Sequence, residues 1–359
     1  MTWRDLTDPR LVARGVDPEA GLKEPVFENL EIPEKLGPAT VLVDDHKIKR
    51  YAFTQDDYHP WHFTDSPFGG RIGHAALLSN DLVQLFTTRY AASRTVGLHT
   101  EEQLWFDGPA RLGDEVTLEG TYVESYTRRG QDYVVMEATA TGPGGRSVLR
   151  HRGVEILRTR PGDVVGRAMS GSGDGGAAGD GAGDGGGAGR GERAGGAGGG
   201  RVDGSFDPAL PTARVADPAT LVPGAPLPTR EATVTQEQAS VFSRCGEYVR
   251  NVHDDLAIAR EGGLRIPIVQ GQQQCGLVTA VLTRFFGAPF FTGGWLRVKF
   301  VQPVEVFEPL VVGGVVKRVE QVAAGGTAVD TEVWVRRADG RLSTVGWASC
   351  TVPPTPAPV

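Results

Sequence analysis

The sequence predicts an α+β protein made of two similar halves, each with one long buried helix enclosed by a curled antiparallel sheet. Three observations support this prediction. An apolar stretch with helical spacing is followed by stretches in which apolar residues alternate. The same order of elements occurs twice along the 359 residues. A segment of mostly Gly and Ala separates the two copies and has no apolar periodicity.

Each copy begins with a short helix-like run, at residues 49–53 and 236–242, followed by a polar loop that contains histidine. Apolar residues then recur three and four positions apart, which predicts helices over 75–90 and 272–286. Both stripes are broad. We therefore expect each of these helices to be surrounded by sheet.

After each helix the period changes to two, which indicates strands. In the first half these lie at 103–106, 115–120 and 133–138, and in the second at 295–300, 310–312 and 328–335. Turn-forming pairs at 129–130, 144–145 and 339–340 separate successive strands and predict hairpins. A buried helix followed by such a meander is an α+β plan.

The division into domains follows from the glycine-rich segment. We expect a first domain over 1–160, a disordered linker over 161–228 and a second domain over 229–359. The stretch at about 170–204 cannot repay its ordering entropy by burial, and proline-rich polar sequence continues to 228. A covalent tether between two modules is the favoured interpretation, with a regulatory or localising segment as the alternative.

Composition excludes several classes of protein. The net charge of −7 is mild and no basic block occurs, so nucleic acid is not an expected partner. No apolar run approaches the roughly 20 residues that span a bilayer, and the N-terminus lacks the layout of a secretory signal. Cys245, Cys275 and Cys350 are widely spaced and form no CxxC pair, which argues against a disulfide framework or a zinc site. We expect a cytoplasmic, reduced protein.

The polar loops carry a recognisable motif. In the first half, residues 57–62 read Asp-Tyr-His-Pro-Trp-His, and this resembles the D-x-N-P-x-H loop of MaoC-like hydratases and dehydratases, with His59 at the usual Asn position. Residues 72–75, Ile-Gly-His-Ala, look like the I-V-H-G run that opens the central helix in that family, with Ala75 at the Gly position.

The second half resembles the same family in a different way. Residues 251–255 read Asn-Val-His-Asp-Asp, and residues 267–271 read Pro-Ile-Val-Gln-Gly, with Gln270 at the second histidine of the family pattern. Glu247 stands in place of the family's Asp, with one residue inserted before His253. The resemblance spans roughly 45–160 and 230–352 and rests on the order and duplication of the motifs.

This resemblance implies a fold and a reaction. The fold would be two fused hotdog domains that form a pseudo-dimeric double hotdog. The reaction would be hydration of an enoyl thioester or dehydration of a 3-hydroxyacyl thioester, by a carboxylate and an imidazole acting as general acid and base. The candidate catalytic pairs are Asp57 with His62 and Glu247 with His253. The motif spacing leaves both pairs open, with a slight preference for Asp57 and His62 because their spacing contains no insertion.

The resemblance also implies how a substrate would be held. The backbone N–H groups of Ala75 and Gly271, at the starts of the two buried helices, would stabilise the enolate oxygen. His74 and Gln270 would contact the substrate. The candidate partners of the carrier's phosphates are Arg71, Arg265 and Arg297. The carrier would be coenzyme A or an acyl carrier protein, no metal or organic cofactor is expected, and the resemblance allows a homodimer of double hotdogs.

Two other functions fit the same residues. A hotdog thioesterase would use a carboxylate-activated water at the thioester carbonyl, although the paired Asp/His loop matches hydratases better. A non-catalytic acyl-thioester-binding subunit is the alternative from another class, and it is supported by the departures at Glu247, Gln270 and Ala75. The sequence does not identify the acyl group.

Overall fold

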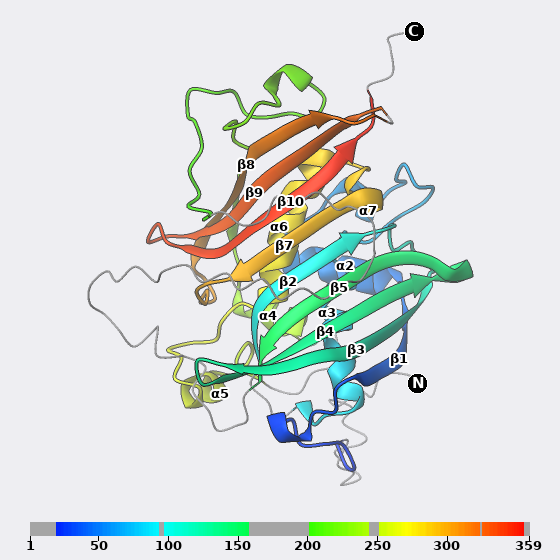
Figure 1. The fold of residues 1–359 in the computed structure, drawn as a ribbon, viewed down its shortest axis with the longest axis vertical. Helices are drawn as coiled ribbons and strands as arrows, with labels where there is room; N and C mark the ends of the chain where they lie inside the picture. The colour runs from blue at the N-terminus through cyan, green and yellow to red at the C-terminus, as the bar shows by residue number, and fades with distance from the viewer. Residues whose placement is uncertain (1–18, 93–96, 158–200, 244–250, 324, 355–359) are drawn as a thin grey trace.

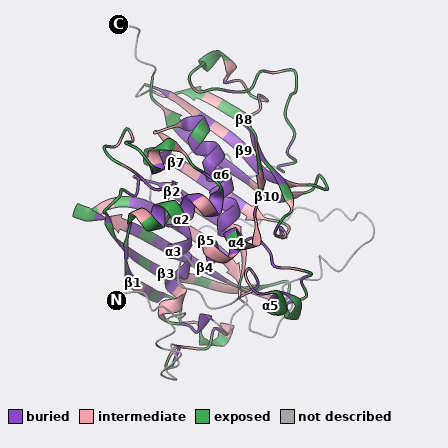
Figure 2. Cartoon of the chain, turned by 180° about the vertical axis from the view of Figure 1, so that it is seen from behind, coloured by how far each residue is buried: buried purple, intermediate pink, exposed green. Residues whose placement is uncertain are grey.

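The computed structural model describes residues 19–92, 97–157, 201–243, 251–323 and 325–354. Its main feature is one antiparallel sheet with the strand order β1-β3-β4-β5-β2-β7-β10-β9-β8-β6. The sheet runs through the whole molecule, and the helices lie against one of its faces (Figures 1 and 2). This arrangement confirms the α+β prediction and the double-hotdog plan.

The first half supplies five strands and most of the short helices. Its elements are η1 (Phe27–Asn29), β1 (Glu34–Leu42), α2 (Asp45–Gln55), η2 (Pro60–His62), α3 (Ser79–Val83), η3 (Gln84–Thr88), β2 (Leu98–Phe106), β3 (Glu115–Arg128), β4 (Gln131–Gly142), η5 (Pro143–Gly145) and β5 (Arg146–Ile156).

The second half repeats this order after the segment at 158–200, which lies outside the described residues. Its elements are η6 (Pro218–Thr220), β6 (Arg230–Thr233), α4 (Gln236–Ser243), α5 (Leu256–Glu261), α6 (Gly271–Phe286), α7 (Phe290–Gly293), β7 (Gly294–Phe300), β8 (Pro309–Gln321), β9 (Thr327–Arg337) and β10 (Leu342–Val352).

The two halves are related by a pseudo-twofold axis that passes between β2 and β7. The sheet order reads outward from this pair as β5-β4-β3-β1 on one side and β10-β9-β8-β6 on the other. Gln103 of β2 pairs with Arg297 of β7, and Leu104 pairs with Leu296. The backbone hydrogen bonds of this strand pair join the two halves into a single sheet, so neither β2 nor β7 is an exposed edge strand.

The hairpins form where turn residues predicted them. Arg129 and Gly130, between β3 and β4, both adopt positive φ values of 53° and 71°. Two successive residues with positive φ are typical of the tight turns that match the twist of a hairpin. Gly340 has a φ of 84° between β9 and β10. The alternating residues of the connected strands therefore keep their register on the two faces of the sheet.

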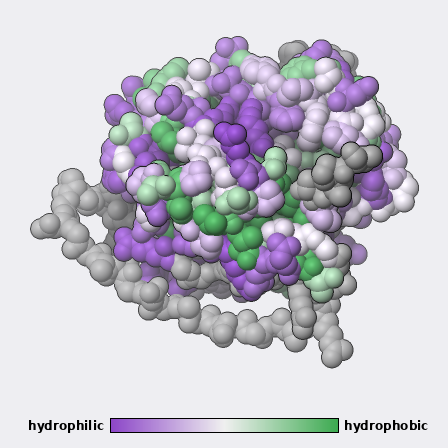
Figure 3. Space-filling model, turned by 90° about the horizontal axis from the view of Figure 1, so that it is seen from above, coloured by the Kyte–Doolittle hydropathy of each residue, from purple (hydrophilic) through white to green (hydrophobic). Residues whose placement is uncertain are grey.

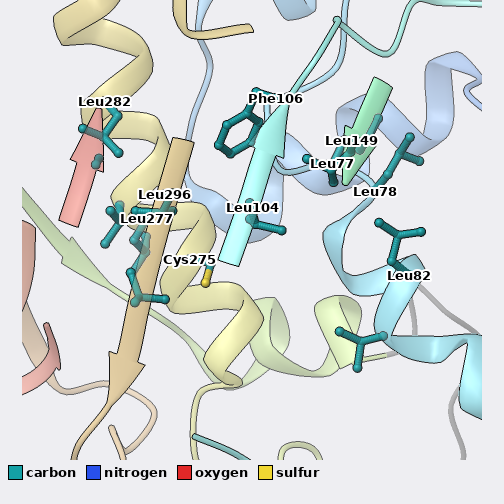
Figure 4. Packing of buried hydrophobic residues seen from close by; sticks show 14 of the residues in the cluster. Leu77, Leu78, Leu82, Leu104, Phe106, Leu149, Cys275, Leu277, Leu282 and Leu296 are labelled. Carbon is teal, nitrogen blue, oxygen red and sulfur yellow. The ribbon is translucent and has the colours of Figure 1, made fainter. Parts of the chain in front are cut away.

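The central helix of the second half is α6, and it agrees with its prediction to within one residue. All of its residues are buried except Gly271 at its start and Arg284 near its end. Leu277 and Leu282 of α6 pack with Leu296 of β7 in the main core (Figure 4). Burial on every side explains why its stripe of apolar residues is so broad.

The first half differs from its prediction, because a single helix over 75–90 does not form. Residues 75–78 are turns, α3 covers Ser79–Val83, and a 3-10 helix, η3, continues to Thr88. At the start of the stretch the backbone has the tighter hydrogen bonds of turns, in which N–H groups donate to carbonyls three residues earlier. Asp81 is paired with Lys47 of α2 at 2.8 Å, and Gln84 donates to Asn80. These contacts provide partners for polar side chains that are buried in this stretch.

Residues 201–228 also differ from the prediction of a disordered linker reaching 228. Val202 is buried against Trp334 and Trp347, and Leu227 belongs to the main core. The N–H groups of Gly224 and Leu227 donate to the carbonyls of Val316 and Gly314 in β8. This segment is ordered because its few apolar residues and backbone groups find partners on β8 and β9, which its composition does not reveal.

None of the helices in the described ranges is long and apolar enough to cross a membrane. Figure 3 shows the molecule from above relative to Figure 1. Polar residues cover much of this face, and a band of apolar residues lies between them.

Candidate functional site

The first candidate residue, Asp57, follows the end of α2. Asp56 caps the helix in the left-handed conformation (φ 45°, ψ 40°), and its N–H donates to the carbonyls of Ala52 and Phe53. The N–H of Asp57 also donates to Ala52. This tight turn reverses the chain, so that the Asp57 side chain is buried with 1% exposure while Asp56 faces solvent.

His62 is the last residue of the 3-10 helix η2. A capping residue and a proline begin this helix. His59 caps this helix by accepting from the N–H of Trp61 at 3.3 Å, so it performs the capping task for which Asn is also suited. The Nδ1 atom of His62 lies 3.0 Å from the carbonyl oxygen of Ile72. Because a carbonyl can only accept, Nδ1 carries the proton and Nε2 presents a lone pair when the ring is neutral.

His74 has the opposite tautomer. Its Nδ1 accepts from the backbone N–H of Ala76 at 3.1 Å, so the proton of the neutral ring is on Nε2. Burial lowers the pKa of His74 to about 3, although Asp57 opposes the shift. At neutral pH His74 is therefore an uncharged donor, and its Nε2 lies 3.4 Å from Oδ2 of Asp57.

The three side chains converge on one carboxylate oxygen. Oδ2 of Asp57 lies 3.9 Å from Nε2 of His62 as well as 3.4 Å from Nε2 of His74. Within the described part of the chain, both Nε2 atoms are buried and lack a hydrogen-bond partner. When one oxygen atom makes two hydrogen bonds of ordinary length at about a right angle, its two partner atoms lie about 4 Å apart. A single hydroxyl group could therefore contact both Asp57 and His62.

Arg284 completes this site from the second half. It is the one exposed residue of α6, and its Nη2 lies 2.5 Å from Oδ1 of Asp57. Burial by itself would raise the pKa of Asp57, but the neighbouring His62, His74 and Arg284 side chains hold this pKa well below its usual range. Asp57 is therefore a permanent anion with one oxygen paired to arginine and the other facing two imidazoles.

Aromatic residues from both halves surround the loop. Trp61 packs against Phe68 of the following loop and against Phe291 of α7, with ring centroids 6.4 and 6.0 Å apart. The side chain of Ser66 hydrogen-bonds to the carbonyl of Gly70, which closes the short loop that carries Phe68. Arg284 and Phe291 both come from the second half, so this site is assembled from the two halves together.

The second half repeats only part of this site. Nδ1 of His253 lies 2.8 Å from the carbonyl oxygen of Ile268, the same contact that His62 makes with Ile72. Burial lowers the pKa of His253 to about 4, so this ring is also neutral with its lone pair on Nε2. Glu247, the expected carboxylate partner, lies outside the described residues. At the position of His74 stands Gln270, which precedes α6 and makes no capping hydrogen bond with its side chain.

The two expected oxyanion donors occupy different settings. Gly271 opens α6 as predicted. A Cβ at this position would lie 3.0–3.2 Å from ring atoms of Phe300. Ala75 does not open a helix, because α3 begins at Ser79. Its N–H nevertheless makes no hydrogen bond to any described residue.

The expected phosphate partners are each bound to a carboxylate. Arg71 donates to Asp45 and to the carbonyl oxygen of His62, so it supports the loop that carries His62. Arg265 pairs with Glu305 and is 78% exposed. Arg297 pairs with Glu101 across the β2–β7 junction and lies over the ring of Trp347.

Sequence reasoning did not find Arg284, although the sequence contains a signal for it. It is the only charged residue in the stretch that forms α6. A charge near the end of a helix that is otherwise buried requires a partner or a path to solvent. That the partner is Asp57, 227 positions earlier in the chain, follows only from the pairing of the halves.

Comparison with known proteins supports the fold. No family model and no curated protein sequence matches this chain. Among solved structures, a MaoC-like dehydratase is similar with a TM-score of 0.65 and 17% identity, covering 92% of this chain and all of that one. A conserved hypothetical protein from Mycobacterium tuberculosis with a double hotdog fold has a TM-score of 0.59 at 16% identity, over 92% of this chain and 98% of that one.

A MaoC domain protein dehydratase from Chloroflexus aurantiacus has a TM-score of 0.59 at 11% identity, over 92% of this chain and 97% of that one. At these identities the likeness establishes the fold. It confirms the double hotdog expected from the motifs, and the chemistry has to be inferred from the site.

Proposed function

We propose that the chain hydrates an enoyl thioester, or dehydrates a 3-hydroxyacyl thioester, at the site formed by Asp57, His62 and His74. The observation that carries this proposal is the opposite tautomers of the two histidines around one carboxylate oxygen. One imidazole presents a lone pair, the other presents a proton, and Asp57 is held as an anion between them. A water molecule and its two protons require such a set of partners.

In the hydration direction, a water molecule would contact Oδ2 of Asp57 and Nε2 of His62. His62 takes one proton as the water oxygen bonds to the β-carbon of the enoyl group. The electrons of the carbon–carbon double bond shift toward the thioester carbonyl and form an enolate. The imidazolium of His62 then returns the proton to the α-carbon, so that H and OH have been added across the double bond and the enzyme is unchanged.

The other groups orient the reactants. Asp57 accepts the second proton of the water in a hydrogen bond and stabilises the imidazolium of His62 when it forms. His74 presents its Nε2–H 3.4 Å from one oxygen of the carboxylate, and Arg284 donates to the other oxygen and fixes the orientation of the group. The N–H of Ala75, next to His74, is the proposed donor to the enolate oxygen, because it makes no hydrogen bond to another described residue.

The first half is the better candidate for the chemistry. The Nε2 atoms of both imidazoles lie within 4 Å of its carboxylate. The second half has a neutral histidine of the same tautomer, but Gln270 replaces the donor histidine and Phe300 packs on Gly271. We propose that the second half mainly shapes the acyl and carrier pocket, and that Arg265, which is largely exposed, is the arginine available to a carrier phosphate.

A substrate panel tests the reaction. Enoyl- and 3-hydroxyacyl-CoAs of increasing chain length would be incubated with the full chain, and products measured by mass spectrometry as a gain or loss of one water. Release of free thiol without a change in the acyl group would instead indicate a thioesterase. Calorimetric binding of the thioesters without turnover by the wild-type protein would favour the non-catalytic subunit and contradict the proposal.

A further inference from the structure

A second cluster of histidine and carboxylate side chains lies in the sheet, away from the catalytic loop. His99 and Glu102 are on β2 and His151 is on the neighbouring β5, where it pairs with Leu104. Because Glu102 and Leu104 are two residues apart, they share the sheet face that packs against α6. Burial, and then the Glu102 carboxylate, raise the pKa of the Cys275 thiol on α6, which agrees with this placement.

The polar atoms of this cluster are close together and yet poorly hydrogen-bonded. Nε2 of His151 lies 2.7 Å from one oxygen of Glu102, and Nε2 of His99 lies 3.4 Å from the other. Among the described residues, neither of these contacts has the direction of a hydrogen bond, so both imidazole Nε2 atoms and both Glu102 oxygens are buried without a partner. Buried polar atoms in this condition are costly, and each calls for an explanation such as an ion.

The sheet provides room for this cluster at one position. Glu102 pairs across the strands with Gly153. A Cβ at Gly153 would lie 2.9 Å from the His151 ring and 3.3 Å from Glu102. The absence of a side chain there allows His151 and Glu102 to approach each other on the inner face.

A fourth polar group lies at the partly exposed side of the cluster. Glu155 of β5 has an oxygen 3.1 Å from Nε2 of His99. The side chains of His99 and Glu155 are 15% and 19% exposed, whereas Glu102 and His151 are fully buried. The cluster therefore has a closed inner end and an outer end that is open to solvent.

We propose that His99, Glu102 and His151 form a binding site for a divalent transition metal ion such as Zn²⁺, with Glu155 or a water as the outer ligand. Imidazole and carboxylate ligands suit this class of ion, and ligands about 2.1 Å from a tetrahedral ion lie about 3.4 Å from each other. The nitrogen–oxygen separations of 3.4 and 3.1 Å around His99 are close to this spacing, and the 2.7 Å between His151 and Glu102 would have to widen to admit an ion. The potential ligand atoms of His99, Glu102 and His151 all lie within 4.8 Å of one another.

The charge of the cluster also suits a divalent ion. Two carboxylates and two neutral imidazoles carry a charge of −2, which one such ion would neutralise. This site does not depend on the proposed hydration, and it was not expected from the sequence, where only the cysteines were weighed as zinc ligands.

The experiment uses the full chain after removal of metal with a chelator. Zn²⁺ binding would be measured by titration calorimetry, and Co²⁺ would be added in parallel because its visible absorption reports coordination geometry. We expect one ion per chain and a tetrahedral Co²⁺ spectrum. His151→Gln should weaken binding by at least about 10²-fold, more than loss of an outer-sphere partner costs. His46→Gln, at an exposed histidine outside the cluster, should leave binding unchanged.

Two further variants keep the test decisive. If His151→Gln lowers the melting temperature so far that it cannot be titrated, His99→Gln replaces a partly exposed ligand and should show the same loss of affinity. Asp57→Asn should retain the ion, since binding that disappears in this variant would belong to the catalytic loop. Failure of the wild-type chain to bind, or equal affinity in the His151 and His46 variants, would show that the cluster is an ion-pair network and overturn the proposal.

Discussion

Replacing Asp57 by Asn is the most direct test of the proposed mechanism. The amide keeps the shape of the side chain but removes the charge that faces His62, His74 and Arg284. Loss of a general acid–base partner typically lowers kcat by about 10²–10⁴-fold, which is about 2.7–5.5 kcal/mol of transition-state stabilisation. We expect a loss in this range with KM changed much less, because in the proposed mechanism Asp57 contacts the water and not the thioester.

The stability of this variant should change little. The side chain of Arg284 is 41% exposed, so solvent screens its pair with Asp57 on the arginine side. Arg284 can also be hydrated once the pair is lost. Thermal unfolding of Asp57→Asn should therefore resemble that of the wild-type chain, and a fall in kcat would not be the result of unfolding.

Asp56→Asn provides a matched control. Asp56 is the neighbouring residue, its side chain is 68% exposed, and Asn tolerates its left-handed conformation. The assay would follow hydration of the best enoyl thioester of the panel under saturating conditions. Asp57→Asn with kcat within threefold of both wild type and Asp56→Asn would refute the assignment of Asp57.

The interaction between Asp57 and His62 offers an independent check. If both act on one water, Asp57→Asn and His62→Ala combined should cost little more than either alone, since the remaining member has little left to do. His253→Ala should affect mainly KM or stability. Fully additive losses, or a loss of kcat confined to His253→Ala, would move the chemistry away from the first half.

Three further results are expected. Gly346→Ala should lower the free energy of unfolding by about 1–3 kcal/mol in urea titrations, because its Cβ would lie 2.5 Å from a backbone oxygen of β7, whereas Gly293→Ala meets open space and should be nearly neutral. The folded-state pKa of His253 is about 4, below the unfolded value. The contribution of this neutral imidazole to stability is therefore complete above about pH 6.5 and is lost as pH falls toward 4. His253→Gln should flatten the profile of melting temperature against pH between these values. A shorter Gly/Ser tether in place of 170–199 should leave the melting temperature within a few degrees, but removal of 201–204 as well should lower it, since Val202 and its neighbours pack on β9 and β10.

Much of the fold was predictable because it depends on local patterns. The duplicated order of helix and strands, α6 and the turn at Arg129 and Gly130 follow from apolar spacing and turn chemistry. The broken helix of the first half was not predictable in this way. Its apolar residues have helical spacing, but at its start the N–H groups bond to carbonyls three residues earlier and the side chain of His74 accepts from the N–H of Ala76. The spacing of apolar residues does not report these contacts.

In the candidate site, too, some features follow from local sequence and others from tertiary contacts. The sequence alone determined that Asp57 and His62 lie on one irregular loop and that His74 precedes a buried segment, because these are short-range relations within a motif. Only the tertiary structure decided the tautomers of the histidines, the pairing of Asp57 with Arg284, and the meeting of His99, Glu102 and His151. Each of these depends on contacts between segments that are distant in the chain. Such contacts depend on which faces of strands and helices pack together. A local pattern of residues shows that a face is apolar, but not which other face it packs against.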